Sequence, residues 1–143
     1  MANPMMILKI SGIVTKKQSK GDVEGCICEL ICKAFTTRNL LHFAHWSTHS
    51  ASDHVALGDL YDSVVSDIDE IVEVYQGKFG LIDDLYTEAA KVPKDITKHV
   101  KDEASWVEEN RTFISRGCTA IENLIDTLIG HYYRVIFKLE NLH

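Results

Sequence analysis

Apolar residues recur every three or four positions over four long segments of this chain, and that rhythm constrains the fold more than any other feature. At 3.6 residues per turn, residues with this spacing form a stripe along one side of a helix. Proline, which interrupts helices, occurs only at Pro4 and Pro93. The chain is therefore expected to be all-α.

The four segments are 22–47, 52–80, 94–116 and 119–139. Amphipathic helices with short connections can bury their stripes only against one another, which predicts a four-helix bundle over 22–143. The stripes supply the expected core, which includes Ile27, Leu30, Leu41, Leu57, Val64, Ile68, Val100, Val107, Ile125, Leu128 and Tyr132.

Capping residues indicate where the first two helices begin and end. Asp22 is a suitable N-cap for the first helix, and Ser52 or Asp53 for the second. Glycine is common just after a helix, so Gly77 and Gly80 are expected to end the second one.

Two segments lie outside the four helices. The sequence LIDDLYTEAAK at 81–91 is expected to form a short helix that Pro93 terminates. Residues 1–21 are expected to form a separate, irregular basic arm. Its lysines could contact DNA phosphates, with binding that weakens steeply with salt, or could simply keep the arm soluble. These lysines are Lys9, Lys16, Lys17 and Lys20.

Composition argues against several classes of protein. The net charge of −6 disfavours a protein that binds nucleic acid over its whole surface. No apolar run approaches the length of a membrane span. The N-terminal MANPMMILKISGIV lacks the positive region and cleavage site of a secretory signal. A cytoplasmic protein without membrane contact is therefore expected.

Three of the four cysteines, Cys26, Cys28 and Cys32, lie together in CICELIC, and the fourth is Cys118. Cys28 and Cys32 are one helical turn apart, a geometry that can share a soft metal. No second Cys-x-x-Cys motif or Cys/His zinc knuckle accompanies them, so a zinc site is weakly supported. Reduced, half-buried thiols are the favoured interpretation.

The stretch HFAHWSTHSASDH at 42–54 contains four of the seven histidines. On a helix, His42, His45 and His49 share one narrow face, while His54 opens the next helix. On that next helix a set of carboxylates falls on the same side as His54, at the flank of the apolar stripe. The set consists of Asp62, Asp69 and Glu73.

Imidazole and carboxylate groups together form a ligand set that suits iron. Asp69 and Glu73 are one turn apart, so both can approach one cation. The alternative is an ordinary solvated face, on which such side chains bind only water and each other.

The order of these residues resembles the Dps-like, or mini-ferritin, branch of the ferritin-like superfamily. The resemblance covers 40–76 and consists of a His-Trp pair, a second histidine, and an Asp and a Glu one turn apart. The matching residues are His45 with Trp46, then His54, then Asp69 and Glu73. The resemblance implies a ferritin-like bundle with a short helix in the second connection.

In that branch one subunit supplies the histidines and its two-fold partner supplies the carboxylates. The resemblance therefore implies a ferroxidase centre at which His45, His54, Asp69 and Glu73 act on ferrous iron. Trp46 would pack beside the centre and quench radicals. It also implies a homo-oligomer, from dimer to dodecamer, that sequesters iron and protects against oxidative damage. Basic N-terminal tails bind DNA in some members.

Two features depart from the pattern. The joint between His45 and His54 is a few residues shorter than is typical, and Gly58 stands where the branch often has an aspartate. Asp59 or Asp62 could substitute. The HW…H…LYD…D…E…YQGK run is also similar to small ferritin-like proteins of tailed bacteriophages, which implies the host cytoplasm as location. A non-catalytic helical dimer or adaptor that binds host proteins or DNA is the alternative function.

Overall fold

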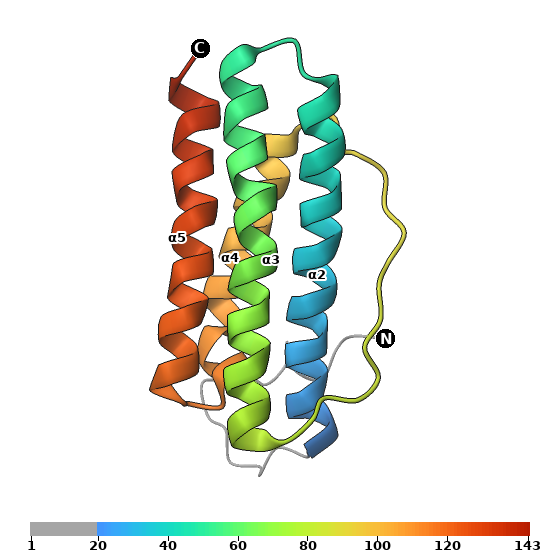
Figure 1. The fold of residues 1–143 in the computed structure, drawn as a ribbon, viewed down its shortest axis with the longest axis vertical. Coiled ribbons are helices and arrows are strands. Elements are labelled where there is room, and N and C mark those ends of the chain that lie inside the picture. The colour runs from blue at the N-terminus through green and yellow to red at the C-terminus, as the bar shows by residue number, and fades with distance from the viewer. Residues whose placement is uncertain (1–19) are drawn as a thin grey trace.

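The computed structural model describes residues 20–143, with side chains described from Cys26 onward. It contains four helices, α2 (Lys20–Ser47), α3 (Ala51–Phe79), α4 (Ile96–Ser115) and α5 (Thr119–Asn141) (Figure 1). The described part has no strand, which confirms the all-α prediction. None of its helices combines the length and the apolarity that a membrane crossing requires.

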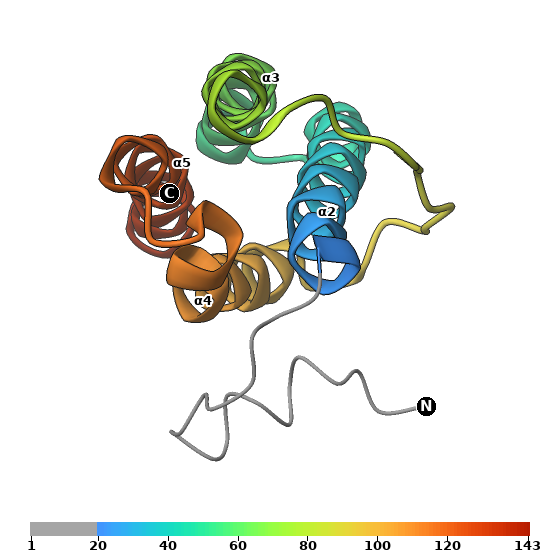
Figure 2. The ribbon, with the colours of Figure 1, turned by 90° about the horizontal axis from the view of Figure 1, so that it is seen from below.

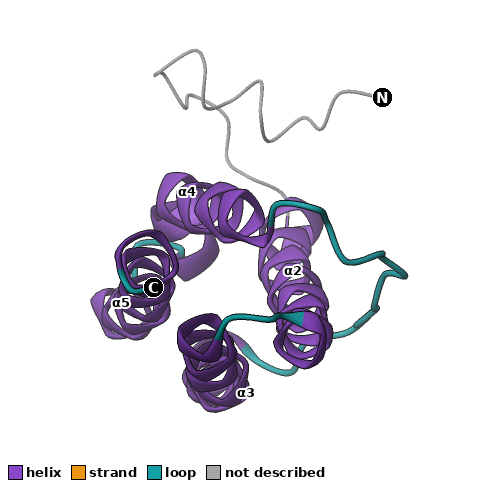
Figure 3. Cartoon of the chain, turned by 90° about the horizontal axis from the view of Figure 1, so that it is seen from above, coloured by secondary structure: helices purple, strands orange, loops and turns teal. Residues whose placement is uncertain are grey.

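The helices form a square in which each one packs against two neighbours. The contacting pairs are α2 with α3, α3 with α5, α5 with α4, and α4 with α2. Views along the bundle axis show this arrangement from both ends (Figures 2 and 3). The predicted four-helix bundle is therefore present.

One connection is long, and it determines the direction of the third helix. The α2–α3 and α4–α5 joints are short turns, so those helix pairs are antiparallel. The 80–95 segment instead runs back along the outside of α2 from one end of the bundle to the other (Figure 1). As a result α3 and α4 point in the same direction, and α5 runs antiparallel to α3.

Capping residues explain where the helices begin and end. The Ser50 hydroxyl accepts a hydrogen bond from the Asp53 N–H and caps α3, so the predicted cap at 52 or 53 was two to three residues late. Asp95 caps α4 in the same way through the Lys98 N–H, at 2.9 Å. Gly77 lies inside α3, and only Gly80, with φ 94°, ends it.

The predicted stripes form the core. Ile27, Leu41, Leu57, Ile125 and Tyr132 are at most 1% exposed, and they belong to one continuous cluster that all four helices share. The first helix ends at Ser47 as predicted, but the predicted N-cap Asp22 was wrong, because α2 already begins at Lys20 and Asp22 lies inside it. The rest of the predicted arm, with Lys9, Lys16 and Lys17, lies outside the described residues.

The predicted short helix at 81–91 was wrong, because no helix lies between α3 and α4. Ile82 is the only buried residue in 81–92, so a helix here would have no apolar face to pack, and short isolated helices are unstable in water. Two contacts hold the start of the segment. The Ile82 N–H donates to Gln76 Oε1 at 3.0 Å, and the Cys28 thiol donates to the Asp83 carbonyl at 3.4 Å.

Tyr132 offers a test of the core. Its ring is fully buried, and its hydroxyl has no hydrogen-bond partner within the part of the chain that the structure describes. Because an unpaired buried hydroxyl opposes folding, Tyr132→Phe is expected to raise the free energy of unfolding by about 1 kcal/mol. Urea denaturation measures this. Tyr133→Phe, at the exposed neighbouring position, is the matched control. A clear loss of stability in Tyr132→Phe alone would show that the hydroxyl has a partner.

Candidate metal centre

His45 and His54 meet at the joint between α2 and α3. His45 lies in the last turn of α2 and His54 in the first turn of α3, and the three-residue turn between the helices brings them together. Their rings stack with centroids 3.5 Å apart and planes 24° from parallel. The shortened joint noted in the sequence is therefore the feature that places the two imidazoles in contact.

Reciprocal hydrogen bonds hold this histidine pair. Nδ1 of His45 lies 2.6 Å from the His54 carbonyl oxygen, and Nδ1 of His54 lies 2.8 Å from the His45 carbonyl oxygen. A carbonyl can only accept, so Nδ1 carries the proton in both rings. Each neutral ring then keeps a lone pair on Nε2. An Nδ1–H bond to a carbonyl is the contact that typically orients a metal-binding histidine.

Gly58 makes this arrangement possible. A Cβ atom at position 58 would lie 3.2 Å from Cε1 and 3.3 Å from Nδ1 of His45. Those distances are shorter than ordinary van der Waals contact, so even an alanine would press on the ring. The aspartate that the resemblance leads one to expect here would therefore require the His45 ring to shift by a few tenths of an ångström.

An aromatic cluster surrounds the histidine pair. The ring of His42 stacks on Tyr61 at 4.1 Å and contacts Trp46 at 4.4 Å. Trp46 is 67% exposed and Phe43 45% exposed, while His49 is also on the surface. Two large apolar side chains are thus exposed beside two imidazoles, a combination typical of an interaction surface.

The carboxylates lie elsewhere on α3. At 1.5 Å of rise per residue, Asp69 is about 22 Å and Glu73 about 28 Å along the helix from His54, and Asp62 about 12 Å. All three side chains are exposed. Within one chain the structure does not bring the imidazoles and the carboxylates together. Over the described residues no group of three or more His, Cys, Asp or Glu side chains is arranged to hold a metal ion.

Sequence reasoning missed two buried carboxylates. Asp67 and Glu103 are each 7% exposed. Asp67 Oδ2 lies 2.5 Å from Nδ1 of His131. Glu103 Oε1 lies 3.1 Å from Nζ of Lys33. The available signal was position, because Asp67 adjoins Ile68 on the apolar face of α3. A charge on such a face requires a partner, which here comes from the neighbouring helix.

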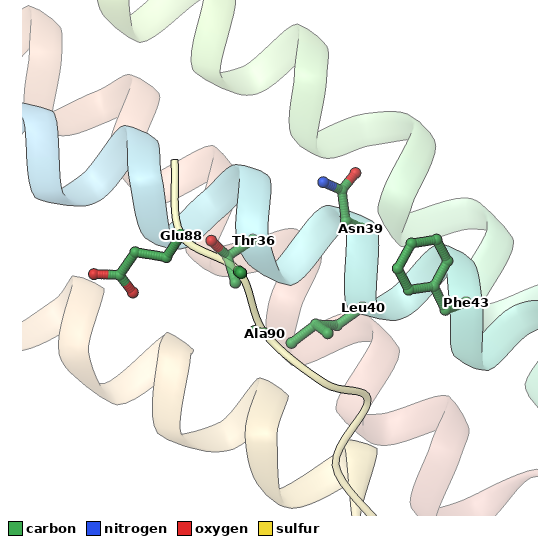
Figure 4. A pocket seen from close by; sticks show the side chains of 7 residues that line it. Thr36, Asn39, Leu40, Phe43, Glu88 and Ala90 are labelled. Carbon is green, nitrogen blue, oxygen red and sulfur yellow. The ribbon is translucent and has the colours of Figure 1, made fainter. Parts of the chain in front are cut away.

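The structure also has a shallow groove that the sequence did not predict. Two adjoining hollows of about 220 and 260 Å³ run between α2 and the 80–95 segment and share Thr36, Leu40, Glu88 and Ala90. Figure 4 shows the first of them, with Phe43 at one end and Glu88 at the other. Its outer wall is the segment that was expected to be helical, so the sequence offered no basis for it.

Carboxylates near this groove affect one another. Burial raises the pKa of the Glu29 carboxyl, and the Lys33 ammonium opposes that rise. The carboxylates of Glu88 and Glu103 add to it. Lys33 therefore acts on two of these acidic groups, because it also pairs with Glu103 at 3.1 Å.

The CICELIC thiols are part of the core. Cys26, Cys28 and Cys32 are at most 5% exposed, more deeply buried than predicted, and no disulfide joins any of the four cysteines. Burial raises the pKa of the Cys32 thiol. These thiols therefore pack as small apolar groups, in keeping with the interpretation favoured over a zinc site.

Replacement of Gly58 tests the packing around His45. Gly130→Ala on α5, where nothing lies within 4 Å of the added Cβ, is expected to gain about 1 kcal/mol of stability from helix propensity. Gly58→Ala is expected to be at least about 1 kcal/mol less stable than Gly130→Ala, because its methyl group overpacks the ring. Thermal unfolding of both variants measures the difference. Equal gains at the two positions would show that the His45 ring is free to move.

Comparison with known proteins places the chain in a family. The search of curated proteins and the search of solved structures gave no match. A family model described as "Family of unknown function (DUF5856)" matches residues 45–139. This range begins at His45, contains all of α3 and α4, and includes His54, Asp69 and Glu73. It covers more than half of the sequence, and the chain therefore belongs to the DUF5856 family.

Proposed function

We propose that the protein is a ferritin-like, Dps-like iron-binding protein that oxidises ferrous iron at a site formed between two copies of the chain. The observation that carries the proposal is the reciprocal pairing of His45 and His54. It orients two neutral imidazoles side by side and leaves both Nε2 atoms without a partner. The same bonds tie the last turn of α2 to the first turn of α3, so the two rings are held in fixed positions.

The topology supports the ferritin-like part of the proposal. A four-helix bundle with one long crossover between its second and third helices is the arrangement found in ferritin-like folds. Here the 80–95 segment is that crossover (Figure 1). An ordinary up-down bundle would have a tight turn at this place.

The distances within one chain favour a site between two chains. At about 1.5 Å of rise per residue, Asp69 and Glu73 lie more than about 20 Å along α3 from His54 of their own chain. In a two-fold dimer with antiparallel α3 helices, each pair of imidazoles can face the carboxylates of the partner. Asp62 can add a further carboxylate. The same interface would cover Trp46 and Phe43, with His42 and His49 at its edge.

The ferrous ion is the substrate of the proposed reaction. The His45 and His54 Nε2 atoms and the Asp69 and Glu73 carboxylates would bind it, a ligand set that suits iron. With hydrogen peroxide as oxidant, two ferrous ions each give up one electron, the O–O bond breaks, and two protons complete two waters. A closed homo-oligomer would then sequester the ferric product, and the net charge of −6 would attract the incoming cations.

Gly58 favours a second candidate function. A carboxylate one turn after His54 would complete the ligand set. Gly58 lacks that group, and a side chain there would press on the His45 ring. The alternative is a non-catalytic ferritin-like dimer or adaptor that uses the exposed Trp46 and Phe43 surface for protein contacts. It differs from the first proposal by the lack of peroxide-driven iron oxidation.

Anaerobic titration with ferrous iron, followed by peroxide, tests the iron proposal through the absorbance of the ferric product. The wild-type chain is expected to oxidise bound iron, and His54→Ala and Asp69→Ala to lose about tenfold or more in rate. His143→Ala and Glu109→Ala, at exposed positions elsewhere, are matched controls. Iron oxidation that is absent in the wild type, or unchanged in His54→Ala, would exclude the proposal.

Subunit mixing tests whether the site is shared. When His54→Ala and Asp69→Ala chains are unfolded together and refolded, half of the dimers contain one chain of each kind. Each mixed dimer has one complete site of two, so about a quarter of the wild-type activity is expected to return. A site within a single chain would give no recovery. Light scattering on the same samples distinguishes a dimer from a dodecamer.

A further inference from the structure

A polar ladder joins α3 to α5 on a face that the proposed iron site does not use. Nδ1 of His131 lies 2.5 Å from Asp67 Oδ2, and Nζ of Lys138 lies 3.0 Å from Asp59 Oδ2. The two helices are neighbours (Figures 2 and 3) and run antiparallel (Figure 1). Each of these contacts therefore pairs an acid on α3 with a base on α5.

The middle position of this ladder breaks the pattern. One turn from both Asp59 and Asp67, α3 carries Ser63, and between His131 and Lys138, α5 carries Arg134. Arg134 is exposed, and no carboxylate of residues 26–143 lies within ion-pair distance of it. The Ser63 hydroxyl donates to the Leu60 carbonyl at 3.0 Å. The ladder thus has one guanidinium without the anion that its two neighbours possess.

A hollow of about 190 Å³ lies at this middle position. Its walls include Ser63, His131, Arg134 and Lys138, together with Asp59 and the apolar Leu60 and Val135. Lys138 offsets the charge of Asp59, and Asp67 faces His131 from the buried side. Among the residues that line the hollow, Arg134 is therefore the charged side chain without an opposite charge beside it.

We infer that this hollow is a binding site for a small phosphate-type oxyanion, which takes the place of the missing carboxylate between α3 and α5. The Arg134 guanidinium can donate two parallel hydrogen bonds to such an anion, and the Lys138 ammonium can donate another. The Ser63 hydroxyl can rotate away from Leu60 to donate as well.

His131 is held so that it can add a further contact. Its Nδ1 bonds to the buried Asp67 carboxylate, so Nε2 is the ring nitrogen available to a ligand. Nε2 donates to an oxyanion when the ring is protonated and accepts from a P–OH group when it is neutral. The donors line the hollow from two helices, which suits a tetrahedral anion with several acceptor oxygens better than a planar carboxylate with two.

Titration followed by NMR tests the site directly. Inorganic phosphate and methyl phosphate, added at constant ionic strength, are expected to shift the backbone amide signals around Ser63 and Arg134, and acetate to shift them much less. The tighter of the two phosphates identifies free phosphate or a phosphate ester as the better ligand. Arg134→Gln is expected to weaken binding about tenfold or more, since a charge-assisted pair is lost. Arg116→Gln, in the α4–α5 turn, is the matched control.

A second variant separates binding from folding. Ser63→Asp supplies the absent carboxylate, so it is expected to pair with Arg134, raise the melting temperature and abolish phosphate binding. Ser66→Asp adds the same charge at an exposed position on α3 and is expected to leave binding intact. Shifts that persist unchanged in both Ser63→Asp and Arg134→Gln, or phosphate that produces no shifts in the wild type, would overturn the inference. Ser63→Asp and Arg134→Gln change none of the residues proposed to bind iron, so this result is independent of the iron assay.

Discussion

Every helix of the bundle must cover its apolar stripe against two neighbours, and the rest of the structure depends on that requirement. The square packing of α2, α3, α5 and α4 satisfies it with one continuous core. A charge on a packed face is tolerated only with a partner from the neighbouring helix. Asp67 with His131 and Glu103 with Lys33 meet that condition, and each pair ties two helices together.

The same packing determines what the α2–α3 joint can offer chemically. A three-residue turn keeps the two helix ends close, and Gly58 lets the His45 ring lie against α3. The reciprocal bonds between His45 and His54 then settle the tautomer of both rings. Two features that depart from the mini-ferritin pattern, the short joint and the glycine, are thus the features that build the histidine pair.

The long crossover has consequences on both sides of the molecule. It makes α3 parallel to α4 and antiparallel to α5, so acids on α3 face bases on α5 in a regular order. It also lies along α2 and forms the outer wall of the groove there (Figure 4). A tight turn between α3 and α4 would have given neither arrangement.

The sequence by itself determined the all-α class, the four helices and most of the core, because a 3.6-residue period is a local property that each segment carries alone. The density of histidines drew attention to 42–54, and the resemblance to the mini-ferritin branch selected His45 and His54 within it. The sequence-based prediction failed at 81–91, where local composition favoured a helix that has nothing to pack against. Only the tertiary structure decided that the two imidazoles bond to each other's backbone and that the carboxylates lie far along α3. It alone matched Asp67 with His131 and left Arg134 unpaired. Contacts between segments depend on the direction and rotation of packed helices, which no single segment encodes.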